Sequence, residues 1–188
     1  MELTPQILIN AYAQGIFPMA EDDGTIYWVD PDPRTIIPLD GFHVSRSLKR
    51  RLRKGGYHVT VDQAFRRVME ECAAPAPGRE ETWISDELID LYTVLHEKGY
   101  THSVEVWIKE QLVGGVYGVS IGKFFAGESM FSRVTNGSKI ALYYLVENLK
   151  RQGYELFDVQ FTTEHLKSLG AIEISRAEYQ RRLKAALS

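Results

Sequence analysis

Hydrophobic and polar residues follow two different periods along this chain. Apolar positions three or four residues apart predict helices over about residues 5–15, 45–55, 62–72, 85–98, 138–153, 164–170 and 176–187. The N-caps expected for five of these helices are Thr4, Ser45 or Ser47, Asp62, Ser85 and Ser175. Apolar runs and strict alternation predict strands at about residues 26–29, 34–39, 57–62, 101–111, 112–121, 123–131 and 155–161. This order of elements predicts an α/β (α+β) fold, with a mixed, mainly antiparallel sheet covered by helices.

The centre of the chain has the pattern of a β-hairpin. Two apolar runs, LVGGVYGVSI and KFFAGESMF, are joined by a turn at Gly122 and Lys123. The first run contains Gly114, Gly115 and Gly118, although glycine weakens a strand. Such glycines allow another backbone or a ligand to approach closely, so we expect something to lie against this part of the sheet.

Glu128 is a charged residue in the apolar second strand of this hairpin. A carboxylate costs free energy in apolar surroundings unless it is paired or solvated. Glu128 is therefore a candidate site residue. The alternative is a glutamate at the edge of the sheet that pairs with a nearby arginine such as Arg133.

The strand ELFDVQF carries two polar residues two positions apart, Asp158 and Gln160. With the period of a strand they point to the same face. Either they form a buried hydrogen-bonded network, or that face of the strand lines a site.

The segment HVSRSLKRRLRKGG predicts a helix that begins at a serine and ends at Gly55 and Gly56. Its cations are Arg46, Lys49, Arg50, Arg51, Arg53 and Lys54. Like charges at this density repel one another, which favours a polyanionic partner such as a nucleic acid. A solvated helix face is the alternative interpretation.

Composition narrows the class of protein. The chain has 188 residues, a formal net charge of −3 and one cysteine, Cys72. It lacks both a run of about 18 apolar residues and the pattern of a signal peptide, which predicts a cytoplasmic protein. We expect a monomer with one compact body, in which residues 1–42 form a small unit packed on a larger domain of residues 43–188.

The sequence lacks the motifs of several common metal, nucleotide and catalytic sites. The five histidines are scattered and match no zinc spacing, and there is no G-x-G-x-x-G or G-x-x-x-x-G-K-[ST] loop. The string AGESMFS is not a G-x-S-x-G nucleophile elbow. We therefore expect neither a metal site nor a serine nucleophile.

Ten strings between about residues 8 and 179 together resemble one enzyme family. They are YAQGIFPM, WVDPDPR, HVSRSLKR, ETWIS, HSVEVW, LVGGVYGV, GESMFSR, SK at 138–139, DVQF and HLKSLGA. In this order they are similar to the leucyl/phenylalanyl-tRNA–protein transferases. The resemblance implies transfer of leucine or phenylalanine, and less well methionine, from charged tRNA to a protein that begins with arginine or lysine.

The resemblance also implies a context for that reaction. The product is marked for degradation through the N-end rule in a bacterial cytoplasm, and the fold resembles the N-acyltransferase (acetyltransferase-like) proteins and the Fem transferases. No cofactor is needed, because an aminoacyl ester is already activated. The partners implied are leucyl-, phenylalanyl- and methionyl-tRNA and acceptor proteins with N-terminal Arg or Lys.

By its motifs, the resemblance assigns candidate residues to each role. The catalytic candidates are Asp158, Gln160 and Glu128; the aminoacyl pocket candidates are Trp28, Trp83, Val116, Phe125 and Leu145; and the tRNA-binding candidates are Arg46, Lys49, Arg50 and Arg53. Gln160, oriented by Asp158, would accept a hydrogen bond from the attacking amine. The proton would pass to Asp158, to a water or to the tRNA 2′-hydroxyl, and Glu128 would bind the cationic acceptor.

The chain departs from the family pattern at two places. Val116 and Leu145 stand where family members often have methionine and phenylalanine, which bears on the preference between leucine and phenylalanine. The segment with a G-G-D-L turn that often precedes the first helix is absent from this sequence.

Rival interpretations of the function are an acetyl-CoA-dependent N-acetyltransferase, an RNA-binding module, and the related transferase that acts on acidic N-termini.

Overall fold

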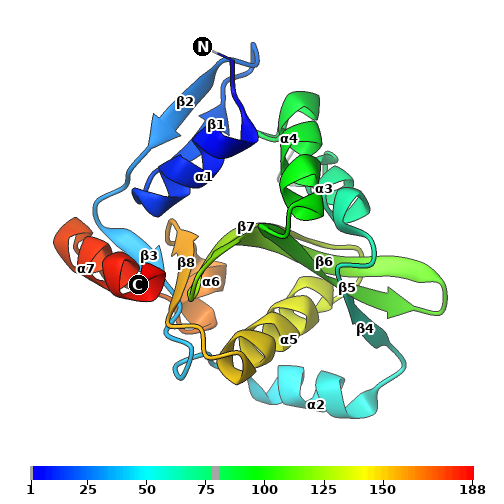
Figure 1. Cartoon of the computed structure of the whole chain (residues 1–188). Coiled ribbons are helices and arrows are strands. Elements are labelled where there is room, and N and C mark those ends of the chain that lie inside the picture. Colours follow the sequence, from blue (N-terminus) through cyan, green and yellow to red (C-terminus); the bar gives the residue numbers. More distant parts are fainter. Residues whose placement is uncertain (1, 78–80) are drawn as a thin grey trace.

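The computed structural model describes residues 2–77 and 81–188 (Figure 1). The helices are α1 (Pro5–Ala13), α2 (Arg46–Lys54), α3 (Phe65–Ala73), α4 (Asp86–Glu97), α5 (Gly137–Arg151), α6 (Glu164–Ser168) and α7 (Arg176–Leu187). The strands are β1 (Phe17–Ala20), β2 (Ile26–Val29), β3 (Arg34–Ile36), β4 (His58–Val61), β5 (Thr101–Ile108), β6 (Gln111–Ile121), β7 (Phe124–Ser132), β8 (Leu156–Gln160) and β9 (Ile172–Ile174).

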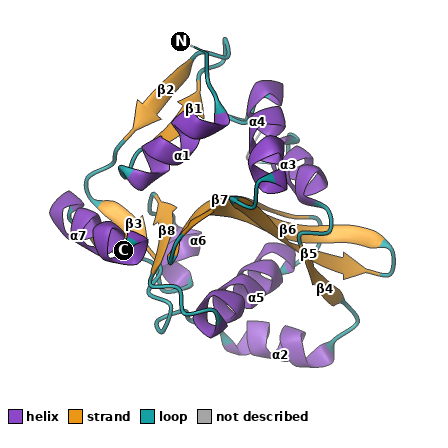
Figure 2. Ribbon diagram, in the orientation of Figure 1, coloured by secondary structure: helices purple, strands orange, loops and turns teal. Residues whose placement is uncertain are grey.

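The strands form a small hairpin and one large sheet (Figure 2). β1 and β2 pair with each other, and the seven-stranded sheet has the order β4-β5-β6-β7-β8-β3-β9. Its neighbours are antiparallel except β7 and β8, which are parallel and are connected through α5. The prediction of a mixed, mainly antiparallel sheet with helices is confirmed.

Helices cover both faces of the large sheet. In Figure 1, α1, α3 and α4 lie above it, and α5 and α2 lie below it. The upper core gathers side chains such as Tyr92, Tyr117 and Phe124, and the lower core gathers others such as Ile140 and Val146. Within residues 2–77 and 81–188, no helix has the length and apolarity needed to cross a membrane.

Four helix starts have the caps expected from the local sequence, and the start of α3 does not. The side chains of the N-cap residues accept hydrogen bonds from backbone N–H groups of the first turn, as predicted, at Thr4, Ser45, Ser85 and Ser175. The expectation that Asp62 caps α3 is wrong. Its carboxylate bonds the ring of His102 and the N–H of Ser103 instead, and Glu105 of β5 accepts the Gln63 N–H at 2.9 Å, just ahead of α3.

The hairpin of β6 and β7 is confirmed, and its glycines admit close neighbours. A Cβ on Gly114 would lie 2.5 Å from the carbonyl carbon and oxygen of Gly137, at the start of α5. A Cβ on Gly118 would lie 2.2 Å from the Ala126 carbonyl oxygen. Backbone therefore approaches at both glycines, and the first contact sets where α5 begins against the sheet.

The N-terminal part of the chain enters the large sheet. Residues 34–36, which the predicted boundary at residue 42 assigns to the N-terminal unit, form β3 between β8 and β9. β1, which the sequence pattern did not predict, pairs Pro18 with Trp28 in the small hairpin. The segment 30–34 therefore connects a peripheral hairpin directly to an inner strand.

Candidate active site

The parallel strands β7 and β8 separate part-way along their length. They pair only at Phe124–Ala126 with Leu156–Asp158, although both strands continue. Beyond that point each strand contains a β-bulge: Glu128 is the extra residue opposite Tyr117 and Gly118, and Val159 is the extra residue opposite Thr35 and Ile36. Bulges re-aim neighbouring side chains, so the strands diverge where Glu128 and Gln160 turn toward each other.

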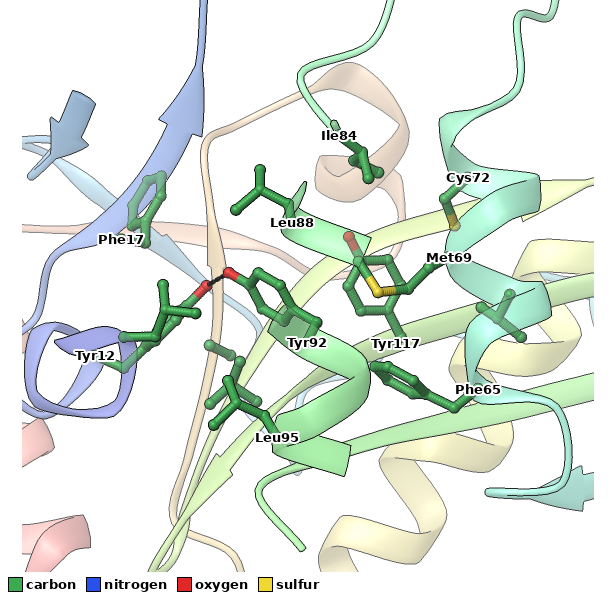
Figure 3. Close-up of a cluster of buried hydrophobic side chains, with 14 of the residues drawn as sticks. Tyr12, Phe17, Phe65, Met69, Cys72, Ile84, Leu88, Tyr92, Leu95 and Tyr117 are labelled. Carbon is green, nitrogen blue, oxygen red and sulfur yellow. Dashed lines mark hydrogen bonds between the residues drawn. The ribbon is translucent and has the colours of Figure 1, made fainter. Parts of the chain in front are cut away.

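The carboxylate of Glu128 is held by hydrogen bonds from two elements. Its Oε1 accepts from the Tyr12 hydroxyl of α1 at 2.6 Å and from Gln160 Nε2 at 3.2 Å. The Tyr12 hydroxyl lies 2.5 Å from the hydroxyl of Tyr92 on α4, as the dashed line in Figure 3 shows. Because the hydrogen of Tyr12 goes to Glu128, Tyr92 donates to Tyr12.

The other oxygen of Glu128, Oε2, is buried and has no hydrogen-bond partner within the described part of the chain. Burial raises the pKa of Glu128 to about 7, although the hydrogen bond from Tyr12 opposes this and the charge of Asp158 adds to it. Burial also raises the pKa of Tyr12 and Tyr92 well above 10, so both hydroxyls keep their protons. Glu128 is therefore the member of this network that changes charge near neutral pH.

Asp158 is completely buried in an ion pair. Its Oδ2 accepts from Arg34 at 2.7 Å and from the Tyr179 hydroxyl at 2.8 Å, and its Oδ1 accepts from Arg34 Nε at 3.2 Å. Arg34 is 1% exposed, lies 4.1 Å from the ring centroid of Tyr179, and donates to the Gly15 carbonyl at 2.7 Å. Of the two alternatives for Asp158, the structure has the buried network.

Gln160 is placed by Asp158. The Asp158 Oδ1 accepts the Gln160 N–H at 2.8 Å, and Gln160 has a φ of 72°. Residues other than glycine rarely adopt this conformation, and it persists only where the surrounding structure enforces it. Gln160 Nε2 donates to Glu128, and no group in the described part of the chain donates to its amide oxygen, which can therefore accept from a substrate.

Arg133 does not pair with Glu128. Its guanidinium donates to Glu71 of α3, with Nε 2.7 Å from the Glu71 Oε2. The interpretation of Glu128 as half of a surface ion pair with Arg133 is therefore wrong.

An apolar pocket of about 210 Å³ opens where β7 and β8 diverge. Its lining comes from β6, β7, β8, α5, α6 and the residue before α6, namely Val116, Gly127, Glu128, Ser129, Met130, Leu142, Phe157, Val159, Thr163 and Leu166. Four consecutive residues of β7 contribute to it. Because neighbouring side chains on a strand point to opposite faces, this run means that the edge of β7 forms one wall.

The structure does not bring the five predicted pocket residues into one cavity. Val116, Phe125 and Leu145 line a second pocket of about 150 Å³ between the sheet and α5, and Val116 lines the first pocket as well. Trp28 lines a different pocket, near α1 and the β1–β2 turn. Trp83 is partly buried against the upper core.

Several residues of this site were not predicted from the sequence. Tyr12 and Arg34 lie inside the strings YAQGIFPM and WVDPDPR, which carried the family resemblance without a role for either residue. Tyr92 and Tyr179 have only the apolar spacing of helix residues. Nothing local marks them as partners of Glu128 and Asp158.

The predicted tRNA-binding residues are all solvent-exposed on α2. Leu48 is the buried residue of this helix, and Arg46, Lys49, Arg50 and Arg53 point outward. In the part of the chain that the structure describes, none of these four forms an ion pair with a carboxylate. Their charge is therefore available to an external anion. Among the described residues, no three His, Cys, Asp or Glu side chains are grouped so that they could hold a metal ion.

Comparison with known sequences identifies the family. The family described as leucyl/phenylalanyl-tRNA protein transferase matches residues 36–184, and its N-terminal domain matches residues 1–32. The chain belongs to this family. The transferase of Rhodospirillum rubrum is 56% identical over all of this chain and 89% of that protein, and that of Maricaulis maris is 57% identical over 96% and 84%. The chain is accordingly an aminoacyltransferase.

Solved structures confirm the acyltransferase-like fold. FemX superposes with a TM-score of 0.61 at 13% identity, over 89% of this chain and 66% of that one. L-PGS from Bacillus licheniformis superposes with a TM-score of 0.50 at 15% identity, over 81% and 56%. At these identities the likeness concerns the fold alone.

The buried acid generates a prediction about stability. A carboxyl whose pKa rises from 4.5 to about 7 on folding destabilises the folded state as the pH rises through that window. We expect Glu128→Gln, which cannot ionise, to be more stable than the wild type by about 3 kcal/mol at pH 8 and by less than about 1 kcal/mol at pH 5. Urea unfolding at the two pH values measures this difference.

The matched control is Glu97→Gln, which removes an exposed carboxylate at the end of α4. It should show no comparable gain at pH 8. An advantage of Glu128→Gln that is equal at both pH values would contradict a raised pKa for Glu128.

Proposed function

We propose that this enzyme transfers leucine or phenylalanine, and less well methionine, from charged tRNA to an N-terminal arginine or lysine of an acceptor protein. The observation that carries the proposal is the pairing of Glu128 with Gln160 beside an apolar pocket. Family membership supports the tRNA donor and the protein acceptor. The product would enter N-end rule degradation in the cytoplasm, and the enzyme would act as a monomer.

The acceptor's α-amino group would lie between Glu128 and Gln160. Oε2 of Glu128 accepts one hydrogen from the amine, and the amide oxygen of Gln160 accepts another. Two fixed acceptors aim the nitrogen lone pair at the ester carbonyl. Such positioning contributes strongly to rate, because oriented reactants gain roughly 7 to 11 kcal/mol over a bimolecular encounter.

The contacts of Asp158 argue against it as the acceptor of the proton. Both oxygens of Asp158 already accept hydrogen bonds from Arg34, Tyr179 and Gln160, so it does not collect a proton from the amine. Glu128 has a pKa of about 7, close to that of an α-amino group at about 7.7 to 8. A base with a pKa near the working pH is well matched to proton transfer.

The reaction then balances without a cofactor. The amine nitrogen bonds to the ester carbonyl carbon, and its proton passes to Glu128 Oε2. The bond from that carbon to the tRNA ribose oxygen breaks, and the leaving oxygen takes a proton from Glu128 or through the neighbouring hydroxyl of the ribose. The products are an amide and uncharged tRNA.

The donor side chain would enter the pocket between β7 and β8. Leu142, Phe157 and Leu166 give this cavity apolar walls next to Glu128. An apolar cavity separates side chains by shape alone, at about 1 to 3 kcal/mol per methylene, so partial acceptance of methionine is expected. The exposed cations of α2 would contact phosphates of the tRNA.

A transfer assay tests the proposed function. Purified enzyme is incubated with radiolabelled leucyl-tRNA and two otherwise identical proteins, one beginning with arginine and one with aspartate. We expect label in the arginine protein only, because the acidic site suits a cationic acceptor. Label in the aspartate protein would assign the chain the opposite acceptor rule, and label in neither would contradict the reaction itself.

The positioning role of Gln160 gives a kinetic prediction. Gln160→Ala removes the acceptor that orients the amine, so we expect kcat to fall about 100-fold with small changes in KM for both substrates. Gln152→Ala is the matched control, because Gln152 is an exposed residue whose side-chain amide donates to Asn148 on its own helix turn. Near-normal turnover of Gln160→Ala at saturating substrate would show that the positioning role is wrong.

A further inference from the structure

An exposed carboxylate shares a row of the sheet with Gln160. On β3, Thr35 pairs with Gln160 of β8 on one side and with Glu173 of β9 on the other. Directly paired residues on neighbouring strands lie side by side on one face. Glu173 is therefore two strands from the residue that positions the acceptor amine.

Two hydroxyls fix the Glu173 carboxylate. Thr162 Oγ1 donates to Glu173 Oε1 at 2.8 Å, and Thr162 Oγ1 lies 2.7 Å from Thr35 Oγ1. Since the hydrogen of Thr162 goes to Glu173, Thr35 donates to Thr162. Thr35 is only 2% exposed, so this chain of hydrogen bonds anchors an exposed carboxylate to the interior of the sheet.

Glu173 has no cation of its own, in contrast to three aspartates near the site. Asp158 pairs with Arg34, and Asp30 and Asp32 pair with Arg176. Within residues 2–77 and 81–188, Glu173 forms no ion pair. A fixed carboxylate without a cation of its own can bind one from a substrate through a charge-assisted hydrogen bond.

The spacing suits an arginine side chain. Two strand spacings place the Cα atoms of Gln160 and Glu173 about 10 Å apart. The α-amino nitrogen and the guanidinium carbon of an extended arginine are separated by six bonds, roughly 7 Å. A hydrogen bond adds about 2.9 Å, so an arginine whose amine lies at Gln160 spans the distance to Glu173.

We propose that Glu173 binds the cationic side chain of the acceptor's N-terminal residue and so selects arginine and lysine. This inference rests on the proposed transfer to basic N-termini, and it assigns the two positive groups of the acceptor to different carboxylates. Glu128, inside the protein, receives the α-amino group. Glu173, at the surface, receives the side chain.

Kinetics with two acceptor peptides test whether Glu173 binds the cationic side chain of the acceptor. Two peptides are compared as acceptors, one beginning with arginine and the other with citrulline, which has the shape of arginine without its charge. With the wild type, we expect kcat/KM to be about tenfold higher for the arginine peptide. With Glu173→Gln, that preference should disappear through a raised KM for the arginine peptide, with kcat and the KM for leucyl-tRNA unchanged.

Two further variants make the result specific. Thr162→Val keeps the Glu173 charge but removes the hydroxyl that orients it, so the preference for arginine should shrink. Glu164→Gln removes an exposed carboxylate of the neighbouring α6 and should leave the preference intact. An equal effect of Glu164→Gln would overturn the proposal, because it would mean that the overall negative charge selects the acceptor.

The outcomes separate this inference from the function on which it rests. Full preference for arginine in Glu173→Gln, or equal use of both peptides by the wild type, overturns the role of Glu173 while leucine transfer stands. Transfer to neither peptide by the wild type overturns both.

Discussion

The buried ion pair between Arg34 and Asp158 is the interaction on which the site depends. It joins the end of α1, through the Gly15 carbonyl, to β3, β8 and the Tyr179 ring of α7. Removing one partner of such a pair costs about 3 to 5 kcal/mol, because the other charge stays buried without compensation. Asp158 also accepts a hydrogen bond from the Gln160 N–H. The ion pair that attaches the N-terminal segment therefore also helps to hold Gln160 in its strained backbone conformation.

This pair gives two neighbouring carboxylates different tasks. Asp158 is neutralised by Arg34 and enclosed by donors, so it works as a fixed part of the framework. Glu128 accepts from Tyr12, which is itself bonded to Tyr92, and its pKa of about 7 lets it change charge near neutral pH. Two carboxyl groups in such different surroundings commonly take different roles, one structural and the other in proton transfer.

Local patterns in the sequence predicted the features that depend only on residues close together in the chain. The hairpin of β6 and β7, the serine and threonine caps and the exposed α2 follow from periodicity and turn chemistry alone. Glu128 was detectable because a charge in an apolar strand is unusual. The prediction that Asp62 caps α3 was wrong because its carboxylate bonds residues of β5 instead, 40 and 41 positions away.

Long-range pairings were beyond the reach of such patterns. Tyr12 is 116 positions from Glu128, and Arg34 is 124 positions from Asp158. The bulges at Glu128 and Val159 break the period of two that places strand side chains. In α5, apolar residues surround most of the helix, so periodicity could not separate Leu142 of the first pocket from Leu145 of the second.

The most direct test of this division between the two acids is an NMR titration of the Glu128 side-chain carboxyl carbon. In the wild type, we expect a midpoint near pH 7, because the carboxyl is buried beside the negative charge of Asp158. In Asp158→Asn the midpoint should fall, because that charge is removed while Arg34 stays. A wild-type midpoint near the ordinary value of 4.5 would contradict the role of Glu128 as the proton acceptor.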